Sequence, residues 1–158
     1  MTRLLMILLI ISALLGCSTA SNDNVTGHTG DQPPQAVIQI ANNSYETILG
    51  TYCWSSNNQS TCVDKAGPAE LLHDVNPVTV EPGAEITFVM NYKPHPNQVY
   101  VEQFSDGEHM EVAIIDNTFH APAQKGIYYY SYGVWWMDES KENVSNGDAF
   151  YHFVIEVK

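Results

Sequence analysis

The chain has 158 residues, and its 18 Asp and Glu outnumber its six Lys and Arg to give a formal net charge of −12 at neutral pH. A surface of this charge repels phosphate backbones, so we expect no nucleic acid partner. The length suits one domain that buries a continuous core without a metal ion or a second subunit.

The first residues have the pattern of an export signal. An apolar run over residues 4–15 follows Arg3, and it is shorter than the about 20 residues that a membrane-spanning helix requires. The run ends in Leu14-Leu15-Gly16-Cys17, which resembles the processing site of bacterial lipoproteins. The resemblance implies that residues 1–16 are a signal peptide that is removed and that Cys17 is lipidated, for example with palmitate. An uncleaved anchor and an ordinary signal peptide cut near Ala20 are the alternatives, and both also export the domain.

Removal of residues 1–16 takes away Arg3 and leaves five Lys against 18 acidic residues, a balance of 5 − 18 = −13. Attachment to a membrane would then come from the lipid and not from a basic patch. We expect residues 17–35 to be the lipidated Cys and a flexible tether, because they are polar and end in Pro33-Pro34. Residues 36–158 form the expected domain, held at the cell membrane on its extracytoplasmic face.

Cys53 and Cys62 remain for a disulfide once Cys17 is assigned to the anchor. Residues 45–54 have a strand pattern, and a two-residue turn at Asn57-Asn58 would place Cys53 opposite Cys62 at a non-hydrogen-bonded site, where the two backbones come closest. Closing so short a loop stabilises by about 2.5 kcal/mol in the chain-entropy model. Redox catalysis and a structural zinc site are weaker alternatives, since neither the spacing nor further ligands are present.

After the predicted tether the sequence alternates with period two almost throughout and has turn residues about every ten positions, a pattern typical of an all-β sandwich or barrel. The predicted short helix covers residues 68–75, where Pro68 takes the first helical position, and it connects two sheets. The predicted strands after it are 78–80, 84–92, 98–104, 109–115, 118–121, 127–137 and 149–157.

Two segments resemble secreted β-sandwich families. The motif Val80-Glu81-Pro82-Gly83 stands before an alternating strand, and the motif Gly126-Ile127-Tyr128-Tyr129-Tyr130 leads to Trp135-Trp136. Both motifs are similar to those of bacterial immunoglobulin-like domains and cupredoxin-like domains. The resemblance implies an immunoglobulin-like antiparallel β-sandwich of about seven to nine strands. In copper-binding cupredoxins it would also imply a Cys and a His on the loop after the Tyr-rich strand, and residues 136–148 contain neither. The whole chain is also similar to secreted lipoproteins of Gram-positive bacteria, which implies a location and no activity.

The candidate binding residues are Trp135, Trp136 and Tyr132, with Asp138 and Glu139 on the loop that follows. Residues 127–137 hold six aromatic side chains, so one face of the strand could present rings to a sugar or a peptide. Burial of all these rings in a sandwich core is the alternative. Of the six rings, we expect Trp135 and Trp136 to be exposed, because they meet the polar loop.

Asp138, Glu139, Glu142 and Asp148 could together hold calcium, although they match no known loop spacing, and a solvated acidic turn is the alternative. The six His are scattered with no pair at ligand spacing, so we predict no metal ligands and no cofactor. His28 falls in the tether, and we expect the other five His to be exposed or half-buried.

We therefore expect a non-catalytic binding module that recognises a protein, a peptide or an envelope polymer near the membrane. A cupredoxin-like metal-handling domain is the alternative from another class. A cell-envelope hydrolase is less favoured, because no Ser lies in a Gly-rich turn between strand and helix, so we predict no catalytic residues and no enzyme.

Overall fold

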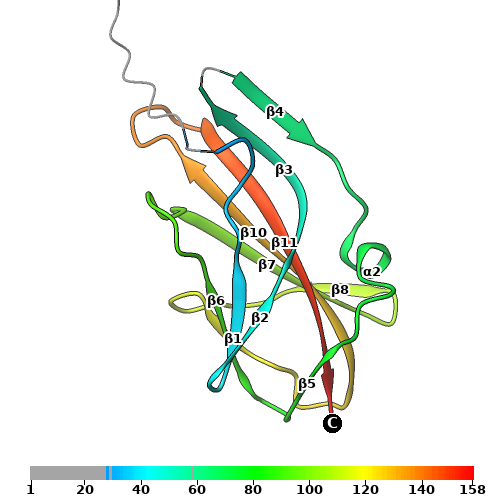
Figure 1. Ribbon diagram of the computed structural model, residues 1–158. Coiled ribbons are helices and arrows are strands. Elements are labelled where there is room, and N and C mark those ends of the chain that lie inside the picture. Colours follow the sequence, from blue (N-terminus) through cyan, green and yellow to red (C-terminus); the bar gives the residue numbers. More distant parts are fainter. Residues whose placement is uncertain (1–27, 29, 58) are drawn as a thin grey trace, which may run out of the picture.

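The computed structural model describes residues 28, 30–57 and 59–158 (Figure 1). The predicted signal peptide over residues 1–16 and the lipidation site Cys17 lie outside these residues. The described chain folds into two β-sheets packed face to face, with one short helix at the side. The prediction of an all-β sandwich with one short connecting helix is confirmed.

The smaller sheet has the strand order β2-β1-β6-β9, and the larger has the order β4-β3-β11-β10-β7-β8, with β5 added in parallel to the end of β11. The other pairings are antiparallel. The bounds are β1 Val37–Ile40, β2 Asn43–Glu46, β3 Ile48–Ser56, β4 Gln59–Val63, α2 Pro68–Leu71, β5 Val78–Val80, β6 Glu85–Val89, β7 Gln98–Ser105, β8 Glu108–Glu111, β9 Thr118–His120, β10 Gly126–Met137 and β11 Ser145–Val157.

The core lies between the sheets and follows from the period-two pattern, because alternate residues of a strand point to opposite faces. On β11, Tyr151, Phe153, Ile155 and Val157 are all buried, as their spacing predicts. Large rings fill much of the space, and Phe88 of β6 stacks on Tyr132 of β10 with ring centroids 3.9 Å apart. Burial of such rings is the main stabilising contribution to a sandwich of this size.

The disulfide prediction is confirmed. β3 and β4 form a hairpin in which Cys53 pairs with Cys62, and the two Cα atoms are 4.1 Å apart. Asn57 has a φ of 50°, the left-handed conformation that a tight two-residue turn requires. The register agrees with the predicted pairing at every position from Cys53 to Ser56.

Several strand and helix predictions are wrong in detail. β8 ends at Glu111 and not at residue 115, and β11 begins at Ser145 and not at residue 149. The run over residues 45–54 is divided between two sheets, because Thr47 leaves the first sheet and its hydroxyl and N–H both donate to the Ala36 carbonyl. The helix ends at Leu71 and not at residue 75, since Leu72 already has a non-helical backbone. It also does not connect two sheets as expected, because β4 before it and β5 after it belong to the same larger sheet. The described residues form eleven strands, more than the seven to nine expected, and β1 was not predicted.

The predicted tether is wrong for His28 and residues 30–35, which pack on the sandwich. Trp54 Nε1 donates to the Gly30 carbonyl at 3.1 Å, and the Tyr151 hydroxyl donates to the Pro34 carbonyl at 2.7 Å. These bonds satisfy polar groups of two buried core rings, so this segment is a part of the domain. The folded region therefore begins before the predicted residue 36.

Candidate binding face

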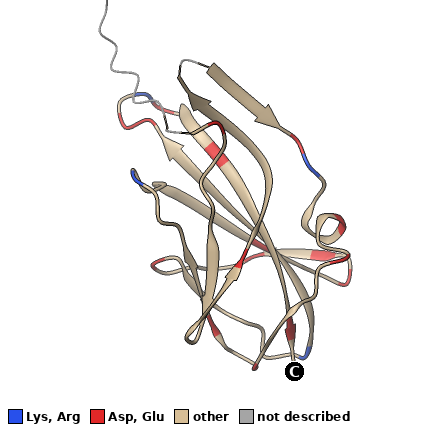
Figure 2. Cartoon of the chain, viewed as in Figure 1, with Lys and Arg blue, Asp and Glu red and all other residues tan. Residues whose placement is uncertain are grey.

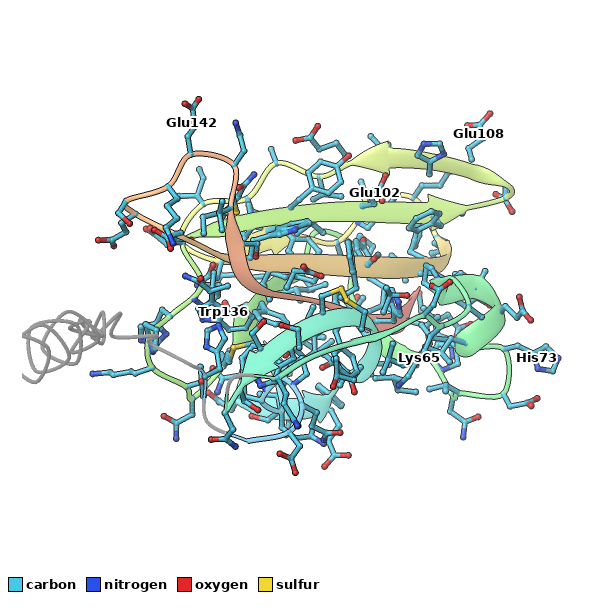
Figure 3. All side chains as sticks on the ribbon, turned by 90° about the horizontal axis from the view of Figure 1, so that it is seen from above. Lys65, His73, Glu102, Glu108, Trp136 and Glu142 are labelled. Atoms are coloured by element: carbon cyan, nitrogen blue, oxygen red, sulfur yellow. A yellow bond between two sulfur atoms is a disulfide. The ribbon has the colours of Figure 1, made fainter. Side chains whose placement is uncertain are left out.

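β10 carries the three aromatic residues predicted to bind, and its two faces have different surroundings. Tyr128, Tyr130, Tyr132, Val134 and Trp136 point inward and are buried. The expected exposure of Trp136 is wrong, since its side chain is 3% exposed. Its Nε1 donates to the Pro94 carbonyl at 2.7 Å, and Figure 3 shows it among packed side chains. Tyr132 is also fully buried, and its hydroxyl donates to Asn117 Oδ1. Both residues belong to the core.

Trp135 lies on the opposite face of the same strand and is half-buried. Its ring meets Phe150 of β11 edge to face, with centroids 5.5 Å apart. Both rings lie over Gly133, where an added Cβ would come within 2.7 Å of the Trp135 ring and 2.9 Å of the Phe150 ring. A glycine is therefore needed for this ring pair to close over the strand.

The neighbouring strands extend this surface in three rows. One row across the sheet holds Tyr100, Gly133 and Phe150, the next holds Glu111, Glu102 and Ser131, and the third holds His109, Phe104 and Tyr129. Val101 between the β7 members is buried, so Tyr100 and Glu102 point outward. We call this surface the outer aromatic face; it comprises Tyr100, Glu102, Phe104, His109, Glu111, Tyr129, Trp135 and Phe150.

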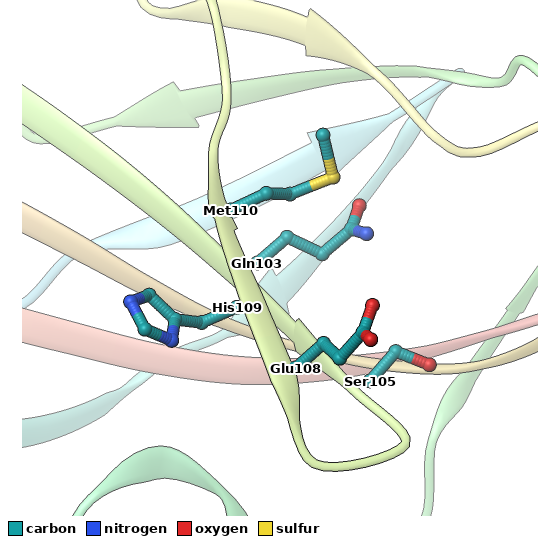
Figure 4. Close-up of a pocket in the computed structure, with 5 residues that line it drawn as sticks. All are labelled: Gln103, Ser105, Glu108, His109 and Met110. Atoms are coloured by element: carbon teal, nitrogen blue, oxygen red, sulfur yellow. The ribbon is translucent and has the colours of Figure 1, made fainter.

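His109 lines a small cavity of about 110 Å³ at the β7–β8 hairpin, but its ring lies on the outer aromatic face. Figure 4 shows its ring on the side of β8 opposite to Met110 and Gln103. On the outer side it stacks on Phe104 at 5.9 Å. Ser105 and Glu108 also line the cavity, but the Ser105 hydroxyl donates to the Ile127 carbonyl. The His109 imidazole is directed away from this hydroxyl, so Ser105 and His109 do not form a nucleophile and its general base.

The outer aromatic face is acidic. Glu102 and Glu111 are directly opposite each other on β7 and β8, an arrangement of like charges that destabilises a sheet. Partial desolvation, followed by the charges of these two carboxylates, raises the pKa of the Tyr100 phenol. The five Lys of the described chain all lie outside its strands, as Figure 2 shows. The strands of the face thus supply no cation of their own, and Lys65, which follows β4, acts on His152 at the far end of the middle row.

One part of the same sheet surface is covered. α2 packs on β10 and β11, and Leu72, His152 and Val154 are buried. The His152 ring contacts Gly50 of β3, where a Cβ would overlap it. Its Nδ1 has no hydrogen-bond partner among the described residues, and burial lowers its pKa to about 4. This covered region, unlike the outer aromatic face, has a structural role.

The predicted acidic loop does not gather its carboxylates. Asp138 Oδ1 accepts bonds from Ser140 Oγ and N and from Lys141 N, and the Ser140 hydroxyl is the main cause of its lowered pKa. Asp148 accepts from the Cys53 N–H, and burial raises its pKa. Glu139 and Glu142 are exposed on the loop, where Figure 3 shows Glu142 at the periphery. Within the described ranges, no three His, Cys, Asp or Glu are grouped to hold a metal ion.

Sequence reasoning missed the buried position of His28. Its ring stacks on Trp54 with centroids 4.0 Å apart, meets Trp136 edge to face at 5.2 Å, and its Nδ1 lies 3.2 Å from the Tyr92 hydroxyl. Desolvation lowers its pKa. The partners are distant in sequence, and no local pattern around His28 indicates them.

Comparisons of the chain with protein-family models, curated proteins and solved structures find no match. In the part of the chain that the structure describes, no helix is long and apolar enough to span a membrane.

Proposed function

We propose that this chain is a non-catalytic binding module on the outer side of the cell membrane, attached by a lipid on Cys17. Its outer aromatic face would contact a protein, a peptide or an envelope polymer. The metal-handling and hydrolase alternatives are less favoured, because the described residues hold no group of metal ligands and the Ser105 hydroxyl does not face the His109 ring.

The ring pair of Trp135 and Phe150 over Gly133 is the observation that carries this proposal. Both rings are only half-buried, although the inner face of β10 shows that this sheet can bury rings completely. Large, rigid rings on an uncovered sheet are typical of contact residues, because they gain most of their burial from a partner.

The chain between Cys17 and the sandwich is short enough to keep the domain near the membrane. His28 is docked on the sandwich, and 28 − 17 = 11 Cα-to-Cα steps separate it from Cys17. A fully extended chain of this length spans at most about 40 Å. A lipid on Cys17 would thus hold this end of the sandwich within about 40 Å of the bilayer, close to partners in the envelope.

Crosslinked capture of partners from membranes tests the proposal. We expect the full-length protein to retain at least one specific partner and Trp135→Ala to lose it. Ile115→Ala is the matched control, because Ile115 is 79% exposed and lies outside the outer aromatic face. An unchanged set of partners for Trp135→Ala, in protein that remains folded, would exclude this face.

A further inference from the structure

We propose that the outer aromatic face binds an extended peptide segment in which a Lys or Arg side chain is flanked, two residues away on each side, by apolar side chains. This inference rests on the proposed function and names the chemistry of the partner.

The central row of the face favours a cation. Glu102 and Glu111 face each other across β7 and β8, and the next outward positions in that row are Ser131 and the buried, neutral His152. A guanidinium or ammonium group placed between the two carboxylates would make charge-assisted hydrogen bonds to both and relieve their repulsion. The raised pKa of the adjacent Tyr100 is consistent with this negative field.

The two outer rows supply rings on both sides of the carboxylates. Tyr100 and Phe150 lie in the row on one side, with Trp135 beside them, and Phe104 and Tyr129 lie in the row on the other side. Aromatic faces attract cations, and they also provide apolar surface for neighbouring side chains. A basic side chain would thus contact the carboxylate row, and its apolar neighbours would contact the aromatic rows on either side.

The spacing of the rows indicates an extended peptide and not a small amine. Tyr100, Glu102 and Phe104 are alternate residues of β7, so successive rows are about 6.6 Å apart. An extended peptide lying along β7 presents its own alternate side chains at the same interval. A single amine would occupy the central row and leave both ring rows uncovered.

The charge of the whole chain favours the same partner. The balance of −13 for residues 17–158 attracts a basic segment over a longer range than the contact itself and repels an acidic one. The described Lys lie in loops and at the chain end, outside the rows of the face.

Binding of three labelled, capped peptides to the full-length lipidated protein, measured by fluorescence anisotropy, tests the inference. We expect the peptide GLSRSLG to bind, its acidic counterpart GLSESLG not to bind, and the isomer GSLRLSG, which has the same composition and the wrong spacing, to bind at least about fivefold more weakly. Equal binding of the two basic isomers, or binding of spermine as tight as that of GLSRSLG, would overturn the extended-peptide assignment.

Charge-neutral variants locate the cation. Glu102→Gln and Glu111→Gln should each weaken binding of GLSRSLG by about tenfold and reduce its dependence on salt. Glu46→Gln on β2 makes the same change of charge on an exposed residue of the other sheet and should leave the affinity unchanged. Equal losses in Glu46→Gln and Glu102→Gln would refute a specific site.

The two proposals fail in different ways. If no basic peptide binds and Trp135→Ala still loses its captured partner, the peptide chemistry is wrong and the binding face stands. If Trp135→Ala keeps its partner as Ile115→Ala does, the face itself is wrong.

Discussion

On the inner face of β10, Tyr130 and Tyr132 are fully buried, and each hydroxyl donates to a side-chain oxygen, of Gln103 and Asn117 respectively. On the outer face, the half-buried rings of Tyr129 and Trp135 alternate with Ser131 and Gly133. The inner rings satisfy every requirement of a core. The outer rings gain less from folding, and the proposed recognition of a partner would account for their exposure.

The adjacent residues Trp135 and Trp136 give the largest expected contrast. Trp136→Ala should lower the free energy of unfolding by about 3 to 5 kcal/mol, because it leaves a cavity and removes the hydrogen bond to Pro94. Trp135→Ala should cost about 1 kcal/mol or less, since its ring is only partly buried. Urea unfolding of the two variants measures both values, and equal losses would mean that the two faces of β10 do not differ.

The buried His152, in the part of the sheet that α2 covers, predicts that the stability of the fold depends on pH. His152 has a folded-state pKa of about 4, below its ordinary value of 6.5, so the folded protein binds fewer protons there than the unfolded chain. Its contribution to stability is present above pH 6.5 and decreases as the pH falls to 4, by about 3 kcal/mol in total.

The variant His152→Phe keeps a ring of similar shape and cannot take up a proton. We expect its unfolding free energy to change less than that of the wild type between pH 6.5 and 4. Thermal unfolding across this range is the measurement, with pH 8 as the reference for both proteins. A variant that loses as much stability as the wild type would show that His152 is not the buried titrating group.

Gly133→Ala tests the geometry of the ring pair. The added methyl group would overlap the rings of Trp135 and Phe150, so one of them must move. We expect a loss of about 1 to 2 kcal/mol in stability, together with weaker binding of the partner. Calorimetry and the capture assay measure the two effects. Unchanged binding would mean that the arrangement of the rings is not used.

Glu102→Gln has the smallest expected effect on folding, and its sign is informative. Because the substitution removes one of two like charges opposite each other, it should stabilise the free protein by about 0.5 kcal/mol. Binding of the basic peptide should weaken in the same variant. A destabilised Glu102→Gln, measured by urea unfolding at low salt, would show that the carboxylate serves the fold.

The sequence is sufficient to predict the elements that local chemistry determines. Asn57 and the spacing of Cys53 and Cys62 predict the hairpin and its register, and alternation predicts the buried face of β11. Alternation does not tell which side of β10 faces solvent, because both sides carry rings. Ser131 and Gly133 were the available signal for the outer side. The burial of His28 depends on Trp54 and Trp136, which are distant in sequence, so no local pattern predicts it.

Photocrosslinking in living cells tests the central claim most directly. Benzoylphenylalanine at position 100 would stand on the outer aromatic face, and the same group at position 46 would stand on the exposed side of β2 in the other sheet. We predict a specific crosslinked partner from position 100 and none from position 46. A partner captured only from position 46, or from neither position, would contradict the assignment of the binding face.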